Sequence, residues 1–166
     1  MVASSWPASG AESDKPGRVP SEAEGKLLHA IEQGNLPLLR AAIAEGADAN
    51  CRGTNGLPPL LVMLRAASAP LDNERRRCVA CLIEHGAKVD PLDSDRRTPL
   101  IHASRLGDLE TIRLLVEADA FVMARDRFHM SALFYAVEAR RRDIVLYLAT
   151  NGDLVSLSLK ERRAGR

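Results

Sequence analysis

The sequence predicts an all-α repeat solenoid, a stack of short helix pairs, and three observations support this prediction. Four similar segments start at positions 25, 58, 98 and 131, so the interval is 33 residues, with one exception of 40. A second landmark follows each start at a constant distance, except in the second unit, where it comes seven residues later. Two short helical patterns lie between the landmarks. One such unit cannot bury its own apolar faces, whereas stacked copies can.

Length and composition exclude several classes of protein. The chain has 166 residues, which fits one domain, and 46% of them are apolar, enough for a core. A net charge of +1 argues against nucleic-acid binding or a polybasic membrane surface as the main function. No apolar run is long enough to span a membrane, and the first twenty residues lack the pattern of a secretory signal. Three cysteines without a framework of spacings favour a reducing compartment, so we expect an intracellular protein, cytoplasmic, nuclear or both.

We expect three parts along the chain. Residues 1–21 are rich in Ser, Pro and Gly and are predicted to form a flexible arm. Residues 22–156 form the repeat domain, and residues 157–166 form a short basic tail. A seven-residue insertion within residues 68–77 explains the long interval and could form a longer first turn before the second helix. We expect it to be a solvated, charged extension, and a protruding contact for a partner is the alternative. The predicted repeats cover residues 25–57, 58–97, 98–130 and 131–156.

The third repeat shows the local signals most clearly. Thr98 is expected to cap the first helix, and Pro99 to occupy its first turn, where a missing N–H costs nothing. Gly107 is expected to end that helix. The two helices each carry an apolar face, formed by Leu100, Ala103 and Leu106 in the first and by Leu109, Ile112, Leu114, Leu115 and Val116 in the second.

These segments resemble ankyrin repeats. The resemblance rests on Thr98-Pro99-Leu100 with Ala103, on the second helix 107–116, and on the hairpin entries at residues 46–50 and 86–90. It covers about residues 22–156 and implies a curved stack of antiparallel helix pairs with projecting hairpin-like loops. It also implies binding of other proteins through the loop tips and the concave face of the first helices.

Three residues depart from this pattern at positions where the family usually has glycine. They are Asp119, His129 and Arg140. A side chain in the left-handed conformation costs on the order of 1 kcal/mol, with Asp tolerated better than Arg. The fourth repeat is therefore expected to be the least ideal one.

Cysteine and histidine positions give no sign of a metal or catalytic centre. Cys78 and Cys81 form a lone CxxC, but they fall on the packing side of a second helix, so core packing is expected. Cys51 lies in a loop, where it could be reactive. We found no nucleophile, phosphate-binding or zinc-protease motif. We therefore expect no metal, no cofactor and no catalytic residues, and an enzyme stays a distant alternative.

Aromatic placement suggests the contact surface. Five of the six aromatic residues follow position 120, and exposed aromatics beside arginine are typical of interface hot spots. Phe134 and Tyr147 fit packing positions. Two histidines occupy the same repeat position, which the resemblance places on the concave face. The expected partner-binding residues are Phe121, Arg125, Arg127, Phe128, Tyr135, His102 and His29. The alternative is an intramolecular cap, in which Trp6 or the basic tail folds onto Phe128.

The resemblance also suggests one modification. Asn50 occupies the position at which some ankyrin proteins are hydroxylated by an asparaginyl oxygenase. That motif prefers a leucine eight residues earlier, where this chain has Ala42.

These observations predict a protein–protein interaction module, an adaptor, scaffold or regulator, that acts by surface complementarity. A dedicated inhibitor that blocks a kinase or a transcription factor is the alternative, because small inhibitors of both kinds resemble this architecture. A structural role in a larger assembly is a third possibility. We expect another protein as partner, no direct nucleic-acid contact, no membrane insertion, and a monomer.

Overall fold

The computed structural model describes residues 20–53, 56–67 and 72–151. Regular structure in these ranges is helical, apart from one antiparallel bridge between Arg125 and Ser131. The chain is helical again over residues 142–151. The seven bounded helices are α1 (Glu22–Gln33), α2 (Leu36–Ala44), α3 (Pro59–Ala66), α4 (Asn73–Glu84), α5 (Pro99–Leu106), α6 (Leu109–Glu117) and α7 (Ala132–Glu138).

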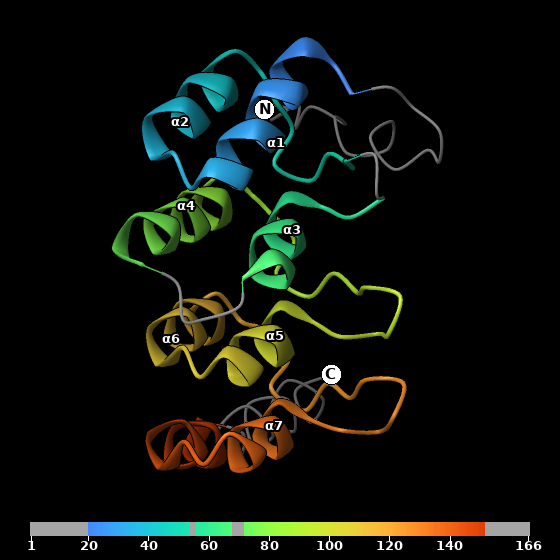
Figure 1. The fold of residues 1–166 in the computed structure, drawn as a ribbon, viewed down its shortest axis with the longest axis vertical. Coiled ribbons are helices and arrows are strands. Elements are labelled where there is room, and N and C mark those ends of the chain that lie inside the picture. Colours follow the sequence, from blue (N-terminus) through green and yellow to red (C-terminus); the bar gives the residue numbers. More distant parts are fainter. Residues whose placement is uncertain (1–19, 54–55, 68–71, 152–166) are drawn as a thin grey trace, which may run out of the picture.

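The helices form a two-row stack (Figure 1). The first helices α1, α3, α5 and α7 pack one on the next in one row, and α2, α4 and α6 pack in the other. The long loops project on the side of the first row. This arrangement confirms the predicted all-α repeat solenoid.

The expected helix signals of the third repeat are confirmed. The Thr98 hydroxyl caps α5 by accepting the Ile101 N–H at 3.3 Å. Gly107 ends α5 in the left-handed conformation, with φ of 70°. The positive φ favours glycine at this turn, whereas the only close neighbour of an added Cβ would be the flexible side chain of Arg141.

The first repeat begins earlier than its start at residue 25 suggested. Ser21 caps α1 and forms a capping box with Glu24, so Gly25 lies inside the helix. Helix α1 begins at Glu22, the first residue of the predicted repeat domain, and Ser21 is its N-cap. Residues 1–19 of the predicted flexible arm lie outside the described residues, and so does the predicted basic tail, residues 157–166.

The insertion in the second repeat lengthens its second helix. Helix α4 has 12 residues, whereas α2 and α6 each have 9. Asp72 caps this longer helix by accepting the Arg75 N–H at 2.8 Å. The longer first turn that the insertion could form is therefore present, and residues 68–71 lie outside the described residues.

The core runs through the stack and includes all three cysteines. Cys78 and Cys81 are buried as expected, and Cys51 is buried as well, so its loop position does not make it accessible. Tyr147 packs against the core. The expected packing of Phe134 is wrong, because its side chain is 41% exposed. Phe134 belongs to the last described repeat, and no further repeat covers it within the described residues.

Four residues other than glycine have left-handed backbone. Asp119, His129 and Arg140 were expected there, and their φ angles are 64°, 62° and 54°. Arg96, with φ of 58°, was not expected. It occupies the same place in its loop as His129 does 33 residues later.

Candidate interaction surface

Two neighbouring loops are each folded around one buried aspartate. One carboxylate oxygen of Asp93 accepts the backbone N–H groups of Asp95 and Arg97, at 2.8 and 2.9 Å. Asp126 does the same one repeat later, accepting from Phe128 and Met130 at 2.9 and 3.0 Å. These bonds tighten each loop into a turn and hold the side chains at its tip in fixed directions.

The second oxygen of each aspartate binds a side chain nine residues later. Asp93 lies 2.9 Å from Nε2 of His102, and Asp126 accepts the hydroxyl of Tyr135 at 2.6 Å. Burial favours the protonated form of Asp126, but the Tyr135 hydroxyl and two backbone N–H groups outweigh it and hold the pKa of this carboxyl below its usual value. The pKa of Asp93 is lowered for the same reason, its donors being two backbone N–H groups and His102.

The two histidines expected on the concave face differ in exposure. His102 is 5% exposed and hydrogen-bonded to Asp93, so it offers no surface to a partner, and its expected contact role is wrong. Burial lowers its pKa, and the neighbouring Asp93 offsets only part of this effect. His29 is exposed on α1, where its Nε2 lies 2.9 Å from Nε2 of Gln33.

Arg97 joins the two loops and was not expected from the sequence. Its guanidinium lies 2.9 Å from Asp95 and 3.5 Å from Asp126. It also lies 5.9 Å from the ring centroids of both Phe128 and Tyr135. A cation between two aromatic rings and two carboxylates fixes the relative positions of all four groups.

Phe128 presents an exposed aromatic ring at the tip of the third loop. Its side chain is 51% exposed, and the Arg127 guanidinium lies 4.9 Å from its ring centroid. Arg127 is itself bound to the preceding loop, because its Nη1 lies 3.0 Å from Asp95 Oδ1 and its backbone N–H donates to the Asp95 carbonyl at 2.9 Å. The ring is therefore displayed on a bridged and ordered pair of loops.

The structure brings together three of the expected partner-binding residues. Arg127, Phe128 and Tyr135 gather around Arg97, and we call these four residues the loop patch. Phe121 is exposed, but its backbone N–H donates to Asp90 at the base of the loops. The Arg125 guanidinium turns back to the His129 carbonyl within its own loop at 3.1 Å. No described contact joins Phe121 or Arg125 to the loop patch.

Asn50, the expected modification site, connects two adjacent hairpins. Its amide nitrogen donates to the Gly86 carbonyl at 2.9 Å, and its amide oxygen accepts the Lys88 N–H at 2.7 Å. Asp90 takes the corresponding position one repeat later and accepts the Phe121 N–H. Both ends of the Asn50 amide are thus engaged between repeats.

The cysteines show the features of core side chains. Burial raises the pKa of the Cys78 thiol to about 11, and the neighbouring Cys81 adds to this shift. Such a thiol is a poor nucleophile and a poor metal ligand at neutral pH. Over the described part of the chain, no three His, Cys, Asp or Glu side chains are grouped so that they could hold a metal ion. Among the described helices, none combines the length and apolar character that a bilayer span requires.

The chain matches the family of ankyrin repeats, present in three copies, over residues 27–126 and 63–157. It is 29% identical over 142 residues to mouse (Mus musculus) Ankyrin repeat domain-containing protein 63, which covers 84% of this chain but only 36% of that protein. The chain therefore spans little more than a third of that relative's length.

Two shorter relatives align along most of their length. Cyclin-dependent kinase 4 inhibitor B of Rattus norvegicus is 30% identical over 129 residues, covering 76% of this chain and 93% of that protein. Cyclin-dependent kinase inhibitor 2A of Homo sapiens is 29% identical over 123 residues, covering 74% of each. The repeated helix pairs, the loops folded around Asp93 and Asp126, and the family match lead to one conclusion: this chain is a member of the ankyrin-repeat family.

Proposed function

We propose that this chain binds a folded partner protein through the loop patch, and that Phe121, Arg125 and His29 provide separate, additional contacts. The observation that carries the proposal is Phe128, a half-exposed aromatic ring held by the arginines of two bridged loops. Aromatic rings beside arginine recur among the residues that contribute most to protein–protein binding. A ring that is already ordered loses little conformational freedom on binding.

The electrostatics of the loop patch favour a partner surface that is apolar at its centre and acidic around it. Arg127 keeps more than half of its side chain exposed although it pairs with Asp95. An incoming carboxylate can therefore approach its outer side. We also propose that the protein is a monomer, that it is intracellular and that it is not an enzyme. Asn50 is the proposed site of hydroxylation.

The second candidate function is steric inhibition of a cyclin-dependent kinase. Two relatives carry such an activity in their names and align along 93% and 74% of their lengths. In this version the loop patch would contact the kinase domain, and no reaction would occur on the ankyrin chain itself.

The test measures binding of the full chain to purified cyclin-dependent kinase 4 and to partners captured from lysate, with two variants alongside. Phe128→Ala removes the displayed ring, and Met123→Ala is the control, because it removes a similarly exposed apolar side chain that has no described contact with the loop patch. The proposal expects at least tenfold weaker binding with the first and no change with the second. Equal binding by all three proteins would refute the loop patch.

The kinase version has its own readout. Stoichiometric loss of kinase activity, relieved by Phe128→Ala, would support it. Full kinase activity in the presence of saturating wild-type chain would exclude inhibition and leave the adaptor role in place.

A further inference from the structure

The last described repeat leaves uncovered a face that the second and third repeats bury. The positions equivalent to Phe134 hold Leu61 and Ile101 in the second and third repeats, and both are fully buried. Val137 is 56% exposed. The equivalents of Val137 are at most 1% exposed and are Ile31, Leu64 and Ser104. At the end of the stack, aliphatic and aromatic side chains are therefore exposed at positions that are buried between stacked repeats.

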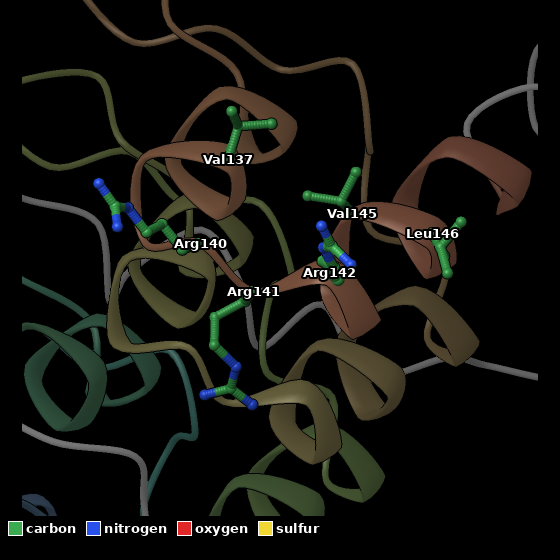
Figure 2. Close-up of a pocket in the computed structure, with 6 residues that line it drawn as sticks. All are labelled: Val137, Arg140, Arg141, Arg142, Val145 and Leu146. Atoms are coloured by element: carbon green, nitrogen blue, oxygen red, sulfur yellow. The ribbon is translucent and has the colours of Figure 1, made fainter.

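This end face contains a cleft (Figure 2). The cleft has a volume of about 490 Å³ and lies between α7, which provides Val137, and the final helical segment, which provides Val145 and Leu146. Leu146 is 69% exposed. Two roughly side-by-side helices with aliphatic residues between them form a groove of the kind that accepts a third helix.

Arginines border this cleft at the turn that joins the two helices. Arg141 pairs with Asp143 at 3.0 Å. Arg140 and Arg142 are exposed, and neither forms an ion pair with another described residue. The cleft is thus aliphatic along its length and positively charged at one end.

We propose that the end face binds an amphipathic helix of a partner protein, one that carries carboxylates beside its apolar side chains. The aliphatic side chains would pack on Val137, Val145 and Leu146, and the carboxylates would pair with Arg140 and Arg142. Charge complementarity selects this occupant. The proposal concerns a different surface from the loop patch and does not depend on it.

Two other occupants fit the charges less well. The residues that follow the last helical segment carry Lys160, Arg162, Arg163 and Arg166 against Asp153 and Glu161. Their excess of positive charge would meet arginines of the same sign. In a two-fold dimer formed through this face, the face meets itself, so its arginines would approach their own copies.

The experiment uses two synthetic helices of about 15 residues, the shortest length at which an isolated helix is marginally stable. Both have leucine at every third or fourth position. One carries glutamate and the other lysine at the neighbouring positions. Fluorescence anisotropy with the full chain should show saturable binding of the glutamate peptide and about tenfold weaker binding of the lysine peptide, since two ion pairs are replaced by two repulsions.

Three variants of the chain sharpen this test. Val137→Asp should abolish binding of the glutamate peptide, because it places a charge in the apolar cleft. The double variant R140D/R142E should reverse the preference and favour the lysine peptide, and aspartate is chosen at 140 because it tolerates the left-handed backbone found there. Leu92→Ala removes an exposed apolar side chain outside both proposed surfaces and should leave both affinities unchanged. Circular dichroism confirms that each variant keeps the helical content of the wild type.

Several outcomes would overturn the proposal. Equal affinity for the two peptides, or no binding of either, would refute an acidic helical occupant. A concentration-dependent dimer in analytical ultracentrifugation that Val137→Asp dissociates would assign the face to a second copy instead. Peptide binding that appears only after residues 153–166 are deleted would assign it to the chain's own C-terminal residues.

Discussion

Tyr135 donates its hydroxyl to the buried carboxylate of Asp126 at 2.6 Å, in the place where His102 meets Asp93 one repeat earlier. Both pairs span nine residues, and both aspartates also hold the loop that precedes the helix. The same structural position is thus filled by two different donors. In the third repeat the donor is buried, whereas Tyr135 is only partly buried and takes part in the loop patch.

Removing the Tyr135 hydroxyl should destabilise the fourth repeat. In Tyr135→Phe, the second oxygen of the buried Asp126 loses its closest donor and keeps only Arg97 at 3.5 Å. We expect the free energy of unfolding to fall by about 1–2 kcal/mol, the usual cost of leaving a buried acceptor poorly satisfied. Urea denaturation followed by circular dichroism measures this loss.

Tyr135→His is the matched control for that variant. It places in the fourth repeat the donor that the third repeat uses against Asp93. We expect it to be more stable than Tyr135→Phe at pH 8. If the two variants are equally stable, the hydroxyl contributes nothing through Asp126.

Acid should destabilise the protein partly through His102. Burial lowers the pKa of His102 in the folded chain below its ordinary value of 6.5. The unfolded chain therefore binds more protons as the pH falls through that value. Stability from this group is complete above about pH 6.5 and is lost progressively below it, as the pH falls toward the lower folded pKa. We therefore expect the midpoint of unfolding to be lower at pH 5 than at pH 7.

His102→Gln separates this effect from the rest of the titration. Glutamine keeps an N–H that can reach Asp93 but has no charge to gain in this range. We expect the unfolding midpoint of His102→Gln to decrease less between pH 7 and pH 5 than that of the wild type. Parallel pH profiles of the two proteins would show that His102 is not responsible. The lowered pKa values of Asp93 and Asp126 act in a separate window, below about pH 4.

The helix pairs and their caps could be predicted because their signals are local. Thr98 and Gly107 bound α5 as expected, since capping depends on residues within one turn. The roles of His102 and Phe134 could not be predicted in the same way. Whether a side chain is buried depends on what the neighbouring loop or repeat provides, and for His102 that was the carboxylate of Asp93.

For a similar reason, only part of the loop patch could be predicted from the sequence. Phe128 and Arg127 stood out by composition, whereas Arg97 comes from the preceding loop and is recognised only when the two loops lie side by side. One signal could have helped. Asp93 and Asp126 are 33 residues apart, each nine residues before a side chain that can donate, and this repetition marks both loops as one kind of structure.

The three thiols should be unreactive in the folded protein. Cys51, Cys78 and Cys81 are at most 2% exposed, and the pKa of Cys78 is raised to about 11 by burial. We expect Ellman's reagent at pH 7.5 to modify no cysteine within minutes in native protein and all three in 6 M guanidinium. Rapid modification of Cys51 in the native protein would show that its loop opens readily.

Arg140→Gly should stabilise the fourth repeat. Arg140 has φ of 54° and is exposed, so its side chain is strained by the left-handed backbone and its removal opens no cavity. We expect the free energy of unfolding to rise by about 0.5–1 kcal/mol, the strain released less the entropy that glycine adds to the unfolded chain. Asp119→Gly, with φ of 64°, should gain less, because Asp tolerates this conformation better.

Arg142→Gly is the control, because Arg142 lies in the final helical segment, where glycine costs stability. Urea titrations of the three variants should therefore rank Arg140→Gly above Asp119→Gly and place Arg142→Gly below the wild type. If Arg140→Gly is instead as destabilising as Arg142→Gly, the arginine stabilises this turn and the left-handed backbone carries no net penalty there.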